Sequence, residues 1–438
     1  MKNKLFLSLL ISACICACNT KPVNPAVEPE KSTDTTTVVD TTVVVPVDTT
    51  NNEVADGVRT PKQITFTSVD EQLLYRTNEF SFNLLSYVSQ HEDKPNIILS
   101  PLSASMMLGM CMNGADDETL EQMQKVLGFE GLTEEQINEY YHNLIVNLPQ
   151  LDTVTKLSIA NSIWIDYRFP VKPNFIDINQ QTFNAASQNV DMANSETVDI
   201  MNKWAADNTN NLIPKIVEQK DIVECVMVLA NALYFKSLWD KKFDEKRTSD
   251  SQFTTFAGSK MSVKMMVLDD ELKYTNLPTS KLLELDYLGG QYCMDILLPT
   301  ANNDIRDIVA ELTIDDWNSY LSMLHPKSVY VNLPKFQLRY DRNLTGDLKA
   351  LGISRAFKPI AQFSRISTIP TYLSWVKQLC YLSVDEEGTE AAAVTVGGFE
   401  TTGMPEYEPF IVDHPFLVVI REKKFGTILF TAIISQPE

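Results

Sequence analysis

The sequence predicts an α+β fold with mixed β-sheets. Helix-like periodicity concentrates in the first half of the chain and strand-like runs in the second half, which does not fit a βαβ repeat. Regular signals continue from about residue 64 to the end of the 438-residue chain without another Pro/Gly-rich break. Such a body is long for a single core, so the fold must be built on large sheets.

Three segments carry helix signals. Gln72–Tyr87 has apolar residues at helical spacing. The acidic run 116–118 can cap a helix that carries Leu120 and Met123 and stops at Gly128. A third helix is expected over Ser195–Asn211.

Strand signals follow these helices. Cys225–Phe235 is a near-continuous apolar run, which suits a strand that is buried on both faces. A hairpin is expected around the turn at 422–426. The other candidate strands, including the two hairpin arms, are Leu157–Ile165, Tyr292–Leu298, Val329–Leu333, Leu379–Val384, Phe416–Arg421 and Thr427–Ile434.

Composition excludes several classes of protein. The net charge of −20 argues against nucleic acid or an anionic membrane surface as the main partner, since both are held by excess Lys and Arg. Apolar residues make up 44% of the chain, too many for a disordered protein. After the first twenty residues no apolar run reaches the ~18 residues that span a bilayer.

The N-terminus has the pattern of a secretory signal peptide. Lys2 and Lys4 precede a short apolar stretch that ends in small residues. The ending, Ile15-Cys16-Ala17-Cys18, resembles a bacterial lipobox, so residues 1–17 are expected to be removed and Cys18 to be lipidated. Cys14 is a weaker second candidate, and an ordinary signal peptide is the alternative to both.

Composition changes again between the signal peptide and the body. Residues 18–62 are rich in Pro, Thr, Asp and Val and lack aromatic side chains, which predicts a disordered, extended tether. The folded domain is therefore expected over 63–438. A lipid at Cys18 would hold that domain to a membrane, since each buried CH₂ contributes ~0.8 kcal/mol.

No catalytic motif stands out in the body. None of the four histidines lies in HExxH or beside a second ligand at metal spacing, and neither GxSxG nor a phosphate-binding glycine loop occurs. Ser374–Lys377 matches SxxK but lacks its companion motifs. The seven cysteines fit no zinc template, and those of the body are expected to be buried thiols. We therefore expect no enzyme, no metal and no cofactor.

One segment, Val384–Gly398, is locally undecided between helix and strand. It starts as an acidic turn, continues through alanines and ends in β-favouring residues and glycines. With a period of two, one face carries only small residues: Thr389, Ala391, Ala393, Thr395 and Gly397. Such a face could enter a sheet as a new strand with little steric cost.

These residues resemble the serpin family over about 64–436. The run "LSVDEEGTEAAAVTV" is similar to the family's hinge. Other blocks follow in the family's order: "NIILSPLSASMMLGM", "LANALYFKSLWDKKF", "LPKFQLRYDRNLTGDLKALGISRAF" and "HPFLVVIREKKFGTILFTAII".

The resemblance implies a serpin fold of three β-sheets and about nine helices, with an exposed reactive-centre loop. A target serine protease would cleave this loop, stay attached as an acyl-enzyme, and be distorted as the loop inserts into the main sheet. The implied hinge residues are Glu386, Glu387, Gly388, Thr389, Glu390, Ala391, Ala392 and Ala393. A non-inhibitory serpin acting as carrier or chaperone is the alternative.

The resemblance also implies two polar sites in the main sheet. Ser100, Ser103 and Asn231 match the family's shutter, a polar network beneath the opening sheet. Gln378 stands where many members have a histidine. Trp239 matches the tryptophan of the breach, where insertion begins.

Counting from Gly388 along the family pattern puts the cleaved bond at Thr402-Gly403. Counting back from His414 gives Met404-Pro405 instead. We prefer the first because proline after the bond is poorly accepted, with Phe399-Glu400 as a minor option. A threonine before the bond suits elastase-like or subtilisin-like proteases.

The expected partner is thus a serine protease, held covalently, and the inhibitor itself is expected to be a monomer. In the heparin-activated subset a helix aligned with Thr133–Asn147 is basic. Here it carries Glu134, Glu135 and Glu139 and no Lys or Arg, so heparin is not expected as a partner. Membrane contact is expected only through the lipid, and the location is the bacterial envelope, on the outer membrane.

Overall fold

The fold comes from a computed structural model that describes residues 12–19, 68–300, 303–389 and 407–438. Ten α-helices and two hydrogen-bonded sheets lie within these ranges. None of the described helices combines the length and apolar character needed to cross a bilayer. The expected signal peptide and tether fall mostly outside the described residues, and their processing stays a prediction.

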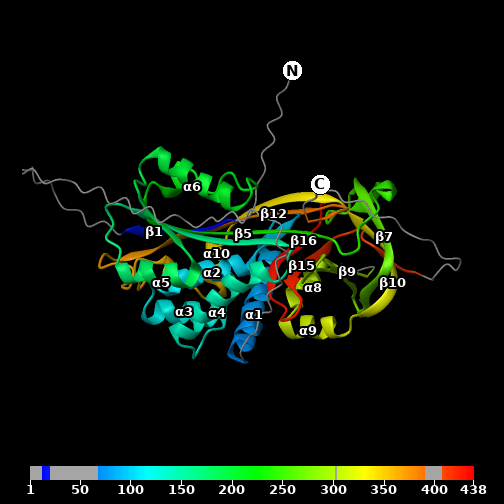
Figure 1. Ribbon diagram of the computed structural model, residues 1–438, viewed down its shortest axis with the longest axis horizontal. Helices are drawn as coiled ribbons and strands as arrows, with labels where there is room; N and C mark the ends of the chain where they lie inside the picture. Colours follow the sequence, from blue (N-terminus) through cyan, green and yellow to red (C-terminus); the bar gives the residue numbers. More distant parts are fainter. Residues whose placement is uncertain (1–11, 20–67, 301–302, 390–406) are drawn as a thin grey trace, which may run out of the picture.

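The first sheet carries the candidate site. Its seven strands include a path in the order β11-β12-β1-β5-β3-β4, and the short β13 pairs with the end of β5. In Figure 1 this sheet lies across the molecule, with α6 on one face and α2, α5 and α10 on the other. Its strands are β11 (Phe336–Asn343), β12 (Thr371–Val384), β1 (Ser12–Asn19), β5 (Cys225–Leu238), β3 (Lys156–Asp166), β4 (Ala186–Val190) and β13 (Gly388–Thr389).

The central strand β5 is the predicted strand at Cys225–Phe235, three residues longer at its end. Nearly every side chain along it is buried, because helices and the second sheet cover the two faces of β5. This explains why its sequence is continuously apolar instead of alternating. The exception at Asn231 is fully buried and belongs to the site described below.

The second sheet has nine strands, eight of them in the order β14-β10-β7-β8-β9-β15-β16-β2, with β6 paired to β7. The long strand β7 connects two parts of this sheet, which are β6-β7-β10-β14 and β8-β9-β15-β16-β2. Counted separately, these two parts and the first sheet make the three sheets that the resemblance implies. The strands are β14 (Glu408–Ile411), β10 (His325–Pro334), β7 (Lys260–Asn276), β8 (Ser280–Asp286), β9 (Tyr292–Pro299), β15 (Phe416–Glu422), β16 (Ile428–Ile434), β2 (Ile97–Leu99) and β6 (Ser249–Thr254).

The predicted helices form, with corrected ends. Helix α3 begins after Asp116 and ends at Gly128, whose φ of 77° is the left-handed conformation of a helix stop. Helix α6 ends at Asn208, short of the predicted Asn211, because Asn210 and Asn211 both have positive φ. The helices are α1 (Ser68–His91), α2 (Pro101–Met112), α3 (Asp117–Leu127), α4 (Glu134–Asn147), α5 (Pro173–Phe183), α6 (Ser195–Asn208), α7 (Gln219–Ile222), α8 (Ile305–Glu311), α9 (Ile314–Ser322) and α10 (Thr345–Leu351).

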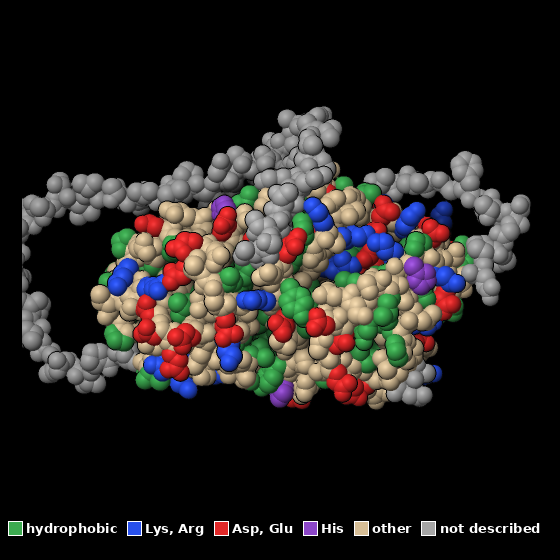
Figure 2. Space-filling view, turned by 90° about the horizontal axis from the view of Figure 1, so that it is seen from below, with side chains coloured by type: hydrophobic (Ala, Val, Ile, Leu, Met, Phe, Trp, Pro, Cys, Tyr) green, Lys and Arg blue, Asp and Glu red, His purple; other side chains and the backbone are tan. Residues whose placement is uncertain are grey.

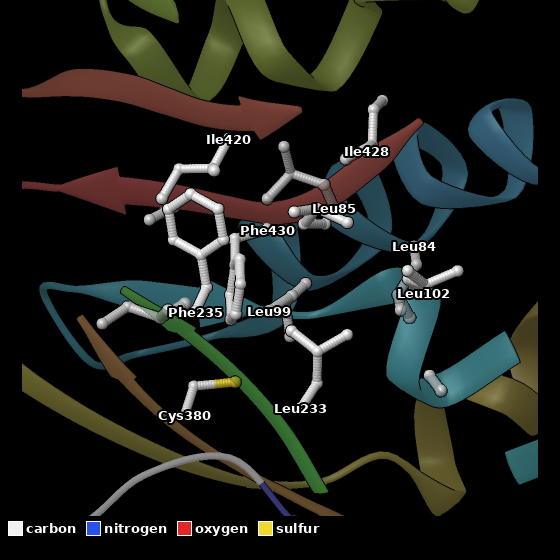
Figure 3. Close-up of a cluster of buried hydrophobic side chains, with 14 of the residues drawn as sticks. Leu84, Leu85, Leu99, Leu102, Leu233, Phe235, Cys380, Ile420, Ile428 and Phe430 are labelled. Atoms are coloured by element: carbon white, nitrogen blue, oxygen red, sulfur yellow. The ribbon is translucent and has the colours of Figure 1, made fainter. Parts of the chain in front are cut away.

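The core lies between the two sheets. Figure 3 shows Phe235 of β5 beside Phe430 of β16 and Ile420 of β15, and the two phenyl rings are 6.4 Å apart. Leu84 and Leu102, from α1 and α2, lie at the other end of the same cluster. The central sheet therefore rests on a continuous apolar layer.

The cysteines follow the prediction in part. Cys111, Cys293 and Cys380 are free and buried. Cys225, however, is disulfide-bonded, so the expectation of a free thiol is wrong there. The backbone register sets Cys18 of β1 directly opposite Cys225. An N-terminal strand beside β5, which the spacing of the cysteines does not reveal, brings these two positions together.

Acidic side chains are spread over the face shown in Figure 2, with basic side chains among them. This distribution agrees with the composition of the chain, which has 57 acidic and 37 basic residues. On α4, Glu134 pairs with Arg365. Glu135 and Glu139 of the same helix are exposed, so α4 presents negative charge at the surface.

Candidate functional site: a loop hinge at an open position in the main sheet

The hinge begins as a short strand at the end of β5. Gly388 and Thr389 pair antiparallel with Leu238 and Ser237. Gly388 approaches the neighbouring backbone so closely that a Cβ there would lie 2.1 Å from the carbonyl oxygen of Ser237. Only glycine fits this position without a shift of β5.

An aspartate turn sets the direction of this strand. The Asp385 carboxylate accepts hydrogen bonds from the backbone N–H groups of Glu387 (3.0 Å) and Gly388 (3.2 Å). The Asp385 N–H donates to the carbonyl of Gly388 at 3.0 Å. The chain thereby reverses from β12 into β13 within four residues.

Trp239, the first residue after β5, binds the turn through two hydrogen bonds. Its indole Nε1 donates to the Asp385 carbonyl at 2.9 Å, and its backbone N–H donates to the Glu387 carbonyl at 2.8 Å. The indole is buried and stacks on Tyr287, with ring centres 4.6 Å apart. The Tyr287 hydroxyl lies 2.7 Å from the Thr389 hydroxyl, so the same aromatic pair holds both ends of the turn.

Two ion pairs fix the hinge glutamates. Lys335 donates to Glu386 at 2.6 Å and Lys242 donates to Glu387 at 2.5 Å. Burial of Glu386 would raise the pKa of its carboxyl group, but hydrogen bonds from Lys335, its own backbone and Thr248 lower that pKa below its ordinary value. Glu386 is therefore held ionised although it is almost fully buried.

The predicted shutter residues come together at the middle of the sheet. Gln378 of β12 accepts from the Ser100 N–H at 3.1 Å and donates to the Ser100 carbonyl at 2.8 Å. The Ser100 hydroxyl donates to the carbonyl of Leu429 at 2.9 Å. Glutamine thus links β12 to the start of α2 through both of its amide atoms.

A second group of shutter residues lies on β5, where the Ser103 hydroxyl donates to the Asn231 side chain. Asn231 in turn donates to Asn161 of β3 at 2.8 Å, and Asn161 donates to the Phe183 carbonyl at 2.8 Å. All these polar side chains are buried and partnered, as burial requires. The shutter consequently has two halves, one tied to β12 and one tied to β5.

Between these halves, β5 and β12 do not pair with each other in the described structure. Ser12–Asn19, as β1, lies between them, antiparallel to both. Beyond β1, toward Thr389, the described part of the chain pairs no strand with β5 residues 232–236 on the edge that faces β12, whereas β3 pairs with their other edge. A cavity opens there, lined by Leu212, Tyr234, Phe235, Tyr381, Leu382, Ser383, Thr389, Ile420 and Phe430. We call the whole position between β5 and β12 the slot.

Several participants were missed from the sequence, including Lys242 and Thr248, which bind the hinge glutamates. Asn161 completes the shutter, and the signal was an asparagine in the middle of the apolar strand "LSIANSIWI". Tyr287 and Lys335 complete the breach, but they lie 102 and 51 residues from their partners Thr389 and Glu386. No local pattern in the sequence indicates contacts at that separation.

Other predicted residues lie outside the described ranges. These are the hinge residues Glu390, Ala391, Ala392 and Ala393 and the candidate cleavage positions Thr402, Gly403, Met404 and Pro405. The roles assigned to them remain predictions. Cys18 lies in β1, where only its backbone is described.

One group of possible metal ligands occurs in the described residues, formed by Glu284, Cys293 and Asp295. Its charges are already matched, because Arg421 donates to Asp295 at 2.6 Å and to Glu284 at 2.5 Å. Burial raises the pKa of the Cys293 thiol, which disfavours the thiolate that would bind a metal. The group is better explained as a buried ion-pair network within the second sheet.

Comparisons with known proteins bear on this geometry. A family model described as "Serpin (serine protease inhibitor)" matches residues 75–437. The chain is 30% identical to a leukocyte elastase inhibitor of Xenopus laevis over 378 residues, which cover 84% of this chain and all of that protein. It is 30% identical to Iripin-2 of Ixodes ricinus, covering 84% and 94% of the two chains.

A solved structure agrees with the fold. The native state of tengpin, a thermophilic serpin, superposes with a TM-score of 0.77 at 29% identity, covering 87% of this chain and 98% of that one. The residues predicted as hinge, breach and shutter therefore lie within a family fold that spans residues 75–437. The chain is a member of the serpin family.

Proposed function

We propose that this serpin inhibits serine proteases as a suicide substrate. The observation that carries the proposal is the placement of Gly388–Thr389, which pair with β5 at one end of the slot between β5 and β12. A loop that continued in this direction would become a new central strand. Its small residues after Thr389 suit such an insertion.

The chemistry would follow from cleavage of the loop. The serine hydroxyl of the protease attacks the carbonyl carbon of Thr402, and the Thr402–Gly403 peptide bond breaks. The new amine leaves with Gly403 while Thr402 stays attached as an ester. Met404-Pro405 is the alternative bond, and Phe399-Glu400 a minor one. A threonine ester favours elastase-like or subtilisin-like targets with small primary pockets.

Insertion would supply the driving force. On the order of ten to twenty new ladder hydrogen bonds, at roughly 1 kcal/mol net each, would contribute ~10–20 kcal/mol. This matches or exceeds an ordinary domain stability of ~5–15 kcal/mol. The intact form would then persist because of a kinetic barrier and not because it is the most stable arrangement.

The test is to mix the chain processed before Cys18 with pancreatic elastase and with subtilisin and to look for a denaturant-resistant adduct on a gel. An adduct whose peptide map ends at Thr402 supports the proposal in full, and one ending at Met404 corrects the bond. Cleaved protein with no adduct for either enzyme contradicts inhibition and favours the carrier or chaperone alternative. The cleaved form should also melt well above the intact form.

We also propose an envelope location. The lipobox-like ending predicts cleavage before Cys18 and a lipid on that cysteine, with Cys14 as the alternative. Labelled palmitate should enter the wild-type chain and the Cys14→Ser variant but not the Cys18→Ser variant. Incorporation into Cys18→Ser would overturn the assignment.

A further inference from the structure

The N-terminal strand β1 occupies the position that the loop needs. It pairs antiparallel with β12 from Ser12 to Asn19 and with β5 from Ala13 to Cys18. At the shutter, Ala13 lies opposite Asn231 on one side and Gln378 on the other. The two halves of the shutter are therefore separated by the chain's own N-terminal segment.

The registers of β1 and β13 on β5 can be compared directly. Thr389 lies opposite Ser237, and each further residue of the loop would move one residue back along β5. If that register continued, six steps would bring Thr395 opposite Asn231, which is the position of Ala13 in β1. Loop residues from Thr395 onward and β1 thus need the same backbone partners and cannot both be present.

Contacts between α7 and β12 span the slot at the level of β1. Lys377 of β12 pairs with Asp221 of α7, and Trp375 Nε1 donates to the Asp221 carbonyl at 3.2 Å. Lys377 and Trp375 are the register partners of Cys14 and Cys16. These contacts hold α7, which immediately precedes β5, against β12 at the level of β1.

We infer that Ser12–Asn19 is a built-in occupant of the slot that prevents loop insertion until the N-terminus is removed. The inference rests on the proposed function. The strand that occupies the slot, SACICACN, consists mainly of small and apolar residues, as does the small-residue face of the hinge. Cleavage before Cys18 would remove six of the eight strand residues and leave the slot free for the loop.

The consequence is a precursor that proteases cut without being trapped. When its loop is cleaved, insertion stops near Val394, the acyl ester remains accessible to water, and the protease is released by hydrolysis. Water supplies the oxygen of the new Thr402 carboxyl group, and the serine hydroxyl of the protease is regenerated. The processed chain follows the inhibitory course instead.

The test uses the full chain with Cys18→Ser, which blocks processing and any oxidation at that position. In this background Ile15→Pro removes a ladder N–H in the middle of β1, and Val27→Pro serves as a matched control outside the strand. The first readout is hydrogen exchange of backbone amides in 225–231 and 372–379. The second is adduct formation with elastase and subtilisin.

Exchange in these two stretches should be at least tenfold faster in Ile15→Pro than in Val27→Pro, and the adduct should dominate only in Ile15→Pro. Equal exchange rates overturn the inference whatever the inhibition assay gives. Equal adduct yields overturn it as well. Faster exchange in Ile15→Pro with no adduct in either variant means that β1 does occupy the slot. The proposed inhibitory function then fails, and with it the regulatory role of β1.

Discussion

The indole Nε1 of Trp239 donates a 2.9 Å hydrogen bond to the carbonyl oxygen of Asp385, joining β5 to the turn that starts the hinge. Replacing Trp239 by Phe removes this bond but keeps an aromatic ring against Tyr287. We expect a loss of about 1 kcal/mol in the free energy of unfolding, because the part-buried Asp385 carbonyl loses a hydrogen-bond donor. Guanidinium unfolding followed by circular dichroism measures this.

Trp317 offers a matched control for that experiment. It is equally buried, and its indole N–H has no partner among the described residues. Trp317→Phe should therefore cost less than Trp239→Phe. Equal losses would mean that ring packing, and not the bond to Asp385, accounts for the effect.

A second prediction concerns pH. Hydrogen bonds from Lys335, the backbone and Thr248 outweigh burial and lower the pKa of Glu386. A lowered carboxyl pKa stabilises the folded state fully above the unfolded value of 4.5 and loses that contribution as pH falls through the folded value. The stability advantage of wild type over Glu386→Gln should be constant above about pH 5.5 and shrink below about pH 4.5.

Melting temperatures of both proteins between pH 7 and 3 check this window. Glu139→Gln on α4, at an exposed position, is measured in parallel as the control for the loss of one surface carboxylate. If the Glu386→Gln difference also stays constant down to pH 3, the ion pair with Lys335 does not stabilise the hinge.

A third prediction tests the close approach at Gly388. A methyl group there would lie 2.1 Å from the Ser237 carbonyl oxygen and 2.7 Å from the Leu238 Cα, both backbone atoms. Gly388→Ala should therefore detach β13 and lower stability by about 1–3 kcal/mol, as overpacking does. At Gly346, in α10, a Cβ meets nothing within 4 Å, so Gly346→Ala should be neutral or stabilising by up to about 1 kcal/mol.

The sequence predicts most strands of this fold because their composition is governed by burial. Cys225–Phe235 is apolar except at Asn231, and the structure buries it between helices and the second sheet. The ends of elements were less predictable. Helix α6 stops three residues early because of two asparagines with positive φ, which the apolar periodicity does not register.

The site divides in the same way. Ser100, Ser103, Asn231 and Gln378 were assigned through motifs, and the structure brings them to one level of the sheet. Contacts such as Lys335 with Glu386 depend on the register of β11 and β12, which follows from hydrogen bonding over the whole sheet. The strand at Ser12–Asn19 was predicted as the end of a signal peptide and the start of a tether, because a short apolar run fits a signal peptide as well as a strand.

A fourth prediction tests the β12 half of the shutter. Gln378→Met keeps the length of the side chain but removes both bonds to Ser100, leaving a buried N–H and carbonyl without these partners. We expect a loss of about 2–5 kcal/mol in unfolding free energy. Gln150, which is exposed and bonds only within its own helical end, is the control, and Gln150→Met should change stability by less than about 0.5 kcal/mol.

The last prediction separates charge from hydrogen bonding at the first residue of the inserting face. Thr389 is buried, and its hydroxyl lies 2.7 Å from that of Tyr287. Thr389→Arg would have to bury a cation without a matched anion, so insertion should slow and the protein should become a substrate of elastase and subtilisin. The same logic applies to Ala391→Glu, two residues further along.

Thr389→Val is the matched variant, because it keeps the shape and loses only the hydroxyl. It should destabilise the hinge by about 1 kcal/mol yet still form the adduct, whereas Thr389→Arg should yield mainly cleaved protein. The ratio of adduct to cleaved chain on a denaturing gel measures the difference. If processed Thr389→Arg traps protease as completely as the processed wild type does, this side chain does not enter the sheet. The inserting face would then be the opposite one, which carries Glu390, Ala392, Val394 and Val396.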